Sequence, residues 1–165
     1  MAEQTRVIII GGGGVGTVAA FNLESGGLAT VSMVLRSNYQ AVLDHGFHID
    51  SCDHGVTPQW RPSGGIFNSV SAAAEKKYDF VVCCTKNIPD PSQSLADLLR
   101  RVVTTGHSTI VLIQNGVNIE NQLIATFPAN VVLSGVSLCG AYEPEPGRII
   151  HNDSDKLLVG ASDRR

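Results

Sequence analysis

Near its start the chain reads Arg6-Val-Ile-Ile-Ile10 and then Gly11-Gly-Gly-Gly-Val-Gly16, an apolar run that leads straight into a glycine loop. A short continuous apolar run is typical of a central parallel strand covered on both faces. Gly11, Gly13 and Gly16 have the spacing of the dinucleotide-binding fingerprint, which needs a tight turn, close approach of the backbone to a pyrophosphate, and close packing of the next helix. We therefore predict a nucleotide-binding loop that also includes Gly14 and Val15, with a plain strand-to-helix turn as the alternative.

Arg36 lies twenty positions beyond Gly16, where a protein that binds NAD usually carries an acidic residue. An acid would accept a hydrogen bond from a ribose 2'-hydroxyl and repel a 2'-phosphate. An arginine instead offers a planar set of donors to a group that carries about two negative charges. Arg36 therefore predicts NADP(H) rather than NAD(H), with a solvated arginine at a strand end as the alternative.

The remaining pattern alternates strands and helices, which indicates an α/β fold of the doubly wound, Rossmann type. Asp90, Pro91 and Gln93 predict the start of the most amphipathic helix, which carries its apolar residues from Leu95 to Val103. We expect strands over 6–10, 30–36, 47–51, 59–61, 66–70, 79–85, 109–114 and 131–138, and helices from the glycine loop to Gly26, over 38–45, from Asp90 onward, and over 119–127.

The C-terminal part departs from this alternation. Glu143–Gly147 is a stretch rich in turn residues, and two extended segments follow it, Arg148–His151 and Lys156–Val159. We expect these two segments to form an antiparallel hairpin that closes a mostly parallel sheet.

Two further polar features follow predicted strands, at the edge where such sheets bind ligands. Lys86 comes directly after the strand 79–85, and Asn115-Gly116 comes directly after the strand 109–114. Together with the glycine loop and Arg36 they predict one cofactor site. Taken singly, Lys86 is also consistent with a surface lysine, and Asn115-Gly116 with a turn.

Length, charge and cysteine usage exclude several classes of protein. A chain of 165 residues is expected to form one domain, and a net charge of −3 gives no patch for nucleic acid or an anionic membrane. We find no apolar run of about 20 residues and no signal peptide, so we expect a soluble, cytoplasmic protein.

The group His45, His48, Cys52, Asp53 and His54 matches no zinc-site spacing, and we expect no metal. Cys83 and Cys84 are expected to be buried thiols on opposite faces of a strand.

In their order along the chain these motifs resemble the ketopantoate reductases (2-dehydropantoate 2-reductases). The resemblance extends from about Arg6 to Gly160 and rests on the GGGGVG loop, VLR ending at Arg36, CTK ending at Lys86, QNG containing Asn115, and the tail GVSLCGAYEPEPGRIIHNDSDKLLVG. It implies NADPH-dependent reduction of a 2-oxo acid, 2-dehydropantoate, to pantoate on the route to coenzyme A. Arg36 would then hold the 2'-phosphate, and Lys86 and Asn115 would lie by the nicotinamide.

Members of that family have a second, helical domain, which carries the general-acid lysine and most substrate ligands, and which this chain lacks because it stops at Arg165. We therefore expect residues 1–165 to be an NADP(H)-binding domain of a longer reductase, with no catalytic residue of its own. Lys156, in the predicted hairpin, is not assigned that role. Another NADP-dependent oxidoreductase acting on 2-oxo or 2-hydroxy acids and a stand-alone NADP(H)-binding module are the alternatives, and an oligomer is compatible with the sequence.

Overall fold

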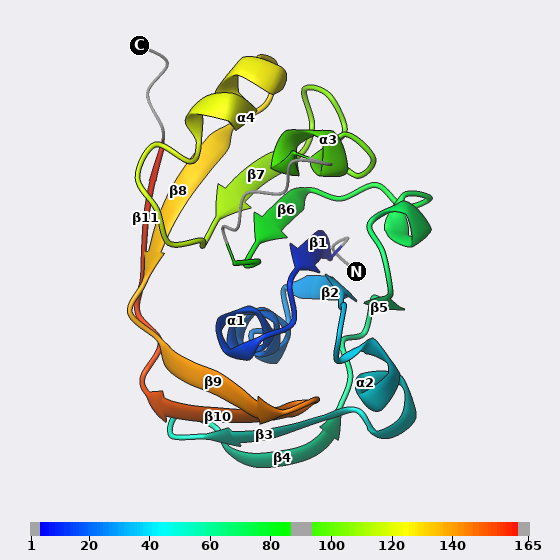
Figure 1. The fold of residues 1–165 in the computed structure, drawn as a ribbon, viewed down its shortest axis with the longest axis vertical. Coiled ribbons are helices and arrows are strands. Elements are labelled where there is room, and N and C mark those ends of the chain that lie inside the picture. Colours follow the sequence, from blue (N-terminus) through cyan, green and yellow to red (C-terminus); the bar gives the residue numbers. More distant parts are fainter. Residues whose placement is uncertain (1–3, 87–93, 162–165) are drawn as a thin grey trace.

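A computed structural model describes residues 4–86 and 94–161, which form two sheets and several helices (Figure 1). The larger sheet has the strand order β5-β2-β1-β6-β7-β8-β11, in which every neighbouring pair is parallel except β8 and β11. The chain moves outward from β1 to one side and then to the other, as the Rossmann-type prediction requires. Its strands are β1 (Thr5–Ile10), β2 (Ala29–Val34), β5 (Gly65–Phe67), β6 (Phe80–Cys83), β7 (Thr109–Leu112), β8 (Val132–Ser137) and β11 (Leu157–Ala161).

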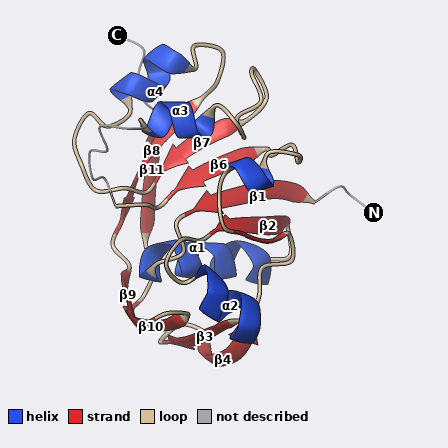
Figure 2. Ribbon diagram, turned by 45° about the vertical axis from the view of Figure 1, so that its right-hand side comes forward, coloured by secondary structure: helices blue, strands red, loops and turns tan. Residues whose placement is uncertain are grey.

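Both faces of the larger sheet are covered, which explains the continuous apolar sequence of β1. Ile8 and Ile10 belong to a core on one face, while Val7 and Ile9 belong to a core on the other. Helix α1 (Gly14–Ser25) lies on the second face, and α3 and α4 lie on the first (Figures 1 and 2). Helices α3 and α4 span Leu95–Leu99 and Asn121–Thr126, and the other helices are α2 (Tyr39–His45) and the 3-10 turn η1 (Ser71–Ala73).

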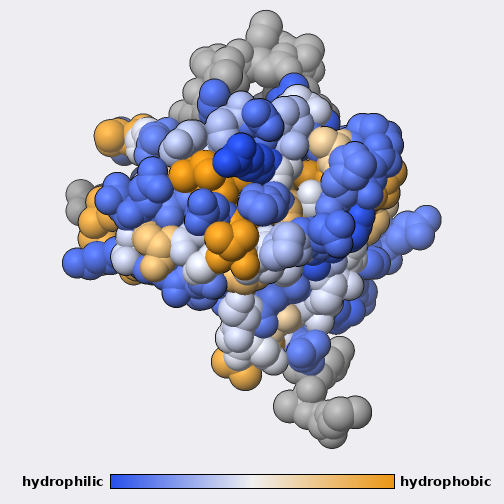
Figure 3. All heavy atoms as spheres, turned by 90° about the horizontal axis from the view of Figure 1, so that it is seen from below, coloured by the Kyte–Doolittle hydropathy of each residue, from blue (hydrophilic) through white to orange (hydrophobic). Residues whose placement is uncertain are grey.

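A second sheet of four strands, in the order β4-β3-β10-β9, covers the side of α1 that faces away from the larger sheet (Figures 1 and 2). Phe47, Ile49 and Ile149 point inward and pack in the same core as Val18 of α1. The outer face of this sheet, seen in Figure 3, is mostly polar with scattered apolar groups. Its strands are β3 (Phe47–Ser51), β4 (Gly55–Trp60), β9 (Gly140–Glu145) and β10 (Arg148–Asp153).

The structure confirms an antiparallel hairpin near the C-terminal end but corrects its strands. Arg148–His151 lies in β10, which pairs antiparallel with β9 and parallel with β3. Lys156–Val159 instead overlaps β11, which pairs with β8 in the larger sheet. The tight turn lies at Pro146-Gly147, where Gly147 has φ 80°, so residues 143–145 continue β9 rather than forming a connector.

Two other predicted elements differ most from the structure in their bounds. The amphipathic helix ends at Leu99, because the N–H groups of Val102 and Val103 both donate to the Leu99 carbonyl and close the chain into a turn. The predicted cap at Asp90, Pro91 and Gln93 lies outside the described residues. Strand β4 starts at Gly55, four residues before its predicted start. None of the helices in residues 4–86 and 94–161 combines the length and the hydrophobicity needed to cross a membrane.

Candidate nucleotide-binding site

The glycine loop makes the turn from β1 into α1 with very little space between backbone segments. Gly11 has φ 111°, and a Cβ placed on it would lie 2.9 Å from the backbone of Cys84 and Thr85. A Cβ at Gly16 would overlap the carbonyl oxygen of Gly11. The first and last glycines of the fingerprint are therefore required by a left-handed turn and by the close approach of α1 to the end of β1.

The start of α1 provides free backbone donors beside open space. Gly13 is the N-cap residue and no side chain caps the helix, so the first-turn N–H groups have no side-chain acceptor. A Cβ at Gly13 would meet no atom within 4 Å, so this part of the backbone is accessible to a ligand. Free N–H groups and the positive end of the helix dipole favour an anion such as a pyrophosphate. These are the features that a bound dinucleotide requires.

Gly14 has an additional packing function. A Cβ at this position would lie 2.5 Å from the carbonyl carbon of Ala141, so the first turn of α1 packs directly against the backbone of β9. Strand β9 of the second sheet thus supports the end of the glycine loop where α1 begins. From its sequence position, Gly14 was predicted only to contact the cofactor.

The carbonyl of Gly12 is held by two side chains that the sequence motifs did not include in the site. Thr17 Oγ1 donates to it at 3.1 Å and Asn38 Nδ2 donates to it at 2.8 Å. Asn38 is buried, and its amide also donates to Glu143 Oε1 at 2.8 Å. The sequence shows Asn38 only as a residue next to a helix start, because its partners lie 26 and 105 positions away.

The parallel strands on both sides of β1 end at the same level. Ile10 is in register with Val34 of β2 and Cys83 of β6, and Cys83 is in register with Leu112 of β7. Residues that follow these strands therefore share one edge of the sheet with the glycine loop. Three predicted site residues lie within three positions of these strand ends: Arg36, Lys86 and Asn115.

The side chains of Arg36, Lys86 and Asn115 are exposed and make no hydrogen bond or ion pair with any described residue. Their polar groups are therefore available to a ligand at this edge. The structure brings all three to the same edge as the glycine loop.

Gln114 is a further polar residue at this edge that the sequence showed only as part of the QNG motif. It is 8% exposed, and its Nε2 donates to the carbonyl oxygen of Thr85 at 2.8 Å and to Thr85 Oγ1 at 2.7 Å. It thereby connects the segments that lead to Lys86 and to Asn115. Its Oε1 has no partner among the described residues and is available as an acceptor.

The two adjacent cysteines at the end of β6 lie on opposite sides of the sheet, as predicted. Cys83 belongs to the core that contains Ile8, and Cys84 packs against the core that contains Ile9. Burial raises the pKa of the Cys84 thiol to about 12 and that of the Cys83 thiol even further. Both thiols are therefore protonated at neutral pH, which excludes them as nucleophiles.

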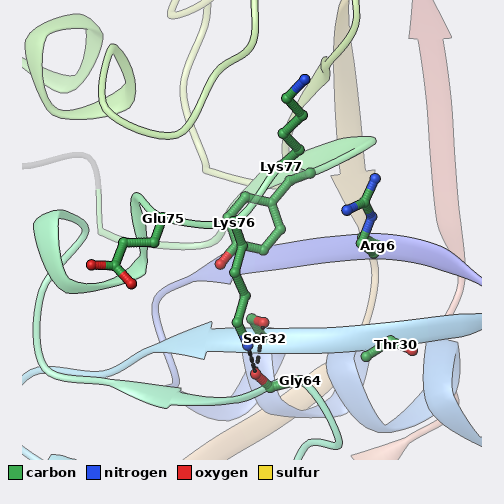
Figure 4. A pocket seen from close by; sticks show the side chains of 8 residues that line it. Arg6, Thr30, Ser32, Gly64, Glu75, Lys76 and Lys77 are labelled. Atoms are coloured by element: carbon green, nitrogen blue, oxygen red, sulfur yellow. Dashed lines mark hydrogen bonds between the residues drawn. The ribbon is translucent and has the colours of Figure 1, made fainter.

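A cavity of about 490 Å³ lies elsewhere, towards the amino-terminal ends of β1 and β2. In Figure 4 the side chains of Ser32 and Lys76 converge on the Gly64 carbonyl, at 3.1 and 2.7 Å, while Lys77 and Glu75 point away from it. Doubly wound sheets bind ligands at the carboxyl ends of their strands, where the glycine loop lies, whereas this cavity lies near the opposite ends.

Comparison with known proteins identifies the family. A model of the ketopantoate reductase PanE/ApbA family matches residues 7–164. The chain belongs to this family. The resemblance seen in the glycine loop, VLR, CTK and QNG motifs is thus confirmed.

Individual ketopantoate reductases and related proteins are similar to the chain over almost its whole length. An uncharacterized protein of Saccharomyces cerevisiae, YDL144C, is 36% identical over 97% of this chain and 50% of its own length. The 2-dehydropantoate 2-reductase of Halobacterium salinarum is 30% identical over 94% of this chain and 48% of its own. The crystal structure of 2-dehydropantoate 2-reductase from Methylococcus capsulatus superposes with a TM-score of 0.82 at 33% identity, covering 94% of this chain and 48% of that one. The chain thus spans about half the length of the curated relatives that it matches.

Proposed function

We propose that this chain is the NADPH-binding domain of a reductase that converts 2-dehydropantoate, a 2-oxo acid, to pantoate in the cytoplasmic biosynthesis of pantothenate and coenzyme A. One observation carries the choice of cofactor: an exposed Arg36 follows β2 at the edge where the glycine loop lies and has no partner within the described chain. Membership of a family that contains 2-dehydropantoate 2-reductases supports the choice of substrate.

In this proposal each residue at this edge contacts a different part of the cofactor. The first-turn N–H groups of α1, at Gly14, Val15 and Gly16, face the pyrophosphate, and the Arg36 guanidinium pairs with the 2'-phosphate. Lys86 and Asn115, beyond β6 and β7, contact the nicotinamide end and the substrate. When bound, NADPH supplies the hydride. The carbonyl oxygen of the substrate gains negative charge during the reduction and needs a proton donor or a cation. We place the proton donor in the part of the protein outside this chain.

Titration calorimetry with NADPH and with NADH tests the cofactor assignment on this chain. We expect NADPH to bind at least tenfold more tightly, since only NADPH offers a phosphate to Arg36. Equal affinities would contradict the assignment.

The substrate assignment needs the whole protein and a separate measurement. The oxidation of NADPH, followed by its absorbance, should accelerate when 2-dehydropantoate is added and should respond much less to pyruvate, a smaller 2-oxo acid. A protein that binds NADPH tightly but does not oxidise it with 2-dehydropantoate would retain the cofactor assignment and lose the substrate assignment.

A further inference from the structure

Three side chains with metal-binding atoms converge at one end of the second sheet. Cys52 and Asp53 lie in the turn after β3, and His151 lies on β10. The pairing of β10 with β3 brings them together, since the N–H of Cys52 donates to the carbonyl of His151 at 2.9 Å. One ligand atom from each residue, a sulfur, a carboxylate oxygen and a ring nitrogen, lies within 4.8 Å of the other two.

The buried ring of His151 has a nitrogen without a partner that faces this cluster. The residue is 1% exposed, and its Nδ1 lies 2.8 Å from Ser51 Oγ. Its Nε2 makes no hydrogen bond with any described residue, and Asp53 Oδ2 lies 3.8 Å away. An unpaired buried polar atom is costly, which indicates that something else satisfies Nε2.

The surroundings of this nitrogen match those of a metal ligand. A histidine that binds a metal through one ring nitrogen usually donates a hydrogen bond from the other. Ser51 Oγ accepts from Nδ1 in the tautomer that carries its proton on Nδ1, and it is also held by the N–H groups of Asp53 and His54, both at 3.2 Å.

The carboxylate of Asp53 is also fixed in position. Ser154 Oγ donates to Oδ1 at 2.6 Å, and the N–H of Asp155 donates to Oδ2 at 3.2 Å. These two bonds hold the carboxylate in one orientation beside Cys52 and His151.

We propose that Cys52, Asp53 and His151 bind a zinc ion, with water as the fourth ligand. Sulfur, nitrogen and oxygen together suit zinc rather than magnesium or calcium, which prefer oxygen alone. Bond lengths near 2.0 Å in a tetrahedral site place a ring nitrogen and a carboxylate oxygen about 3.3 Å apart, so Nε2 and Oδ2 need to approach by only about 0.5 Å. As the sulfur–zinc bond forms, the Cys52 thiol releases its proton to solvent, and His151 binds through Nε2 with its proton on Nδ1.

Sequence spacing alone did not reveal this site, because two of its ligands lie in one turn and the third lies about a hundred positions away. A bound ion would join the turn after β3 to β10, on the side of the protein that the proposed cofactor site does not use. The proposal is therefore independent of the proposed function.

Titration of the chelator-treated protein with Zn²⁺ and with Co²⁺, under a reductant that does not bind metals, tests the site. We expect one equivalent of Zn²⁺ to bind, and Co²⁺ to give a near-ultraviolet thiolate charge-transfer band. Cys52→Ser, which changes an exposed side chain and should fold normally, is expected to abolish the band and weaken Zn²⁺ binding at least tenfold. Ser51→Ala, which removes no ligand atom but takes away the partner of His151 Nδ1 and of the Asp53 and His54 N–H groups, is expected to weaken binding about tenfold while leaving the band.

Cys139→Ser is the matched control, because it removes a different thiol outside the three ligands. It should keep both the band and the affinity. Unchanged Zn²⁺ affinity in Cys52→Ser, or a band lost in Cys139→Ser instead, would overturn the assignment. Zn²⁺ binding without a thiolate band in Co²⁺ would show adventitious binding to the surface carboxylates.

Discussion

Asn38 and Gly12 are joined by a buried hydrogen bond of 2.8 Å that makes the glycine loop depend on the second sheet. The same amide nitrogen of Asn38 donates to Glu143 of β9, and the carboxylate of Glu143 also accepts from the N–H of Gly147 at 2.8 Å. One chain of hydrogen bonds therefore connects the glycine loop to the turn between β9 and β10.

Replacing Asn38 tests this connection. We expect Asn38→Ala to reduce the free energy of unfolding by about 1–3 kcal/mol, because buried hydrogen-bond partners lose their donor, and to weaken NADPH binding as the loop loses support. Urea denaturation and calorimetry measure the two effects. Gln40→Ala, on the exposed side of α2, is the control and should change stability by less than about 0.5 kcal/mol. Equal behaviour of the two variants would show that the bond does not support the loop.

The glycines of the loop should separate into a packing position and a binding position. Gly16→Ala places a methyl group against the Gly11 carbonyl and should destabilise the protein by about 1–3 kcal/mol. Gly13→Ala places the same group in open space at an ordinary φ of −77°, so stability should stay within about 0.5 kcal/mol. NADPH affinity should nevertheless fall in Gly13→Ala, because the methyl group occupies the approach of the pyrophosphate. Unimpaired NADPH binding by Gly13→Ala would remove Gly13 from the proposed site.

Removing the charge of Arg36 should affect one cofactor only. Arg36→Ala should weaken NADPH binding by about 1.5–3 kcal/mol and leave NADH binding unchanged, because only the 2'-phosphate loses a charge-assisted partner. Arg101→Ala removes another exposed arginine, in the turn that follows α3, and should alter neither affinity. Calorimetric titration of both variants with both cofactors gives the comparison. An equal loss for NADPH and NADH in Arg36→Ala would assign the residue to a different part of the cofactor.

Asp79 should make stability depend on pH. Its Oδ2 accepts from the N–H of Arg6 at 2.7 Å, and its Oδ1 lies 2.8 Å from His107 Nε2. The hydrogen bond from Arg6, followed by that from His107, lowers the pKa of Asp79 below 3.8 in the folded state. The stabilisation is therefore complete above that value and disappears as the pH falls through the lower, folded-state pKa.

The variant Asp79→Asn should thus be less stable than the unmodified protein at pH 7, and the difference should shrink towards pH 3. Urea denaturation at several pH values follows this difference. Asp50→Asn, an exposed carboxylate on β3 with no hydrogen bond to a described residue, should show no such trend. A constant difference between Asp79→Asn and the unmodified protein over the whole pH range would exclude this linkage.

Local patterns were sufficient to predict the parallel strands of the larger sheet and the edge at which the glycine loop lies. The apolar run before Gly11, the glycine spacing and the position of Arg36 each depend on a few neighbouring residues. The second sheet was harder to predict because its edge strands contain prolines, which usually indicate turns. Pro58 lies in β4 and Pro144 lies in β9, and both strands are at the edge of their sheet, where a missing N–H donor is tolerated.

Contacts between distant segments left no signal in the sequence. Asn38 with Glu143, and Cys52 with His151, meet only because β10 lies beside β3. Periodicity identifies the buried face of each strand, but it does not identify the strand that will lie beside it.

The parallel alignment of β3 with β10 also has a consequence for the order of folding. During synthesis His48 is added about a hundred residues before its neighbour Arg148. Until β10 is made, the β3 strand of the β3–β4 hairpin therefore has an edge whose backbone groups are unpaired. Closing so long a loop is slow, and the small sheet should form late, after the central strands have condensed. Nascent chains that stop before residue 148 should therefore be prone to aggregation.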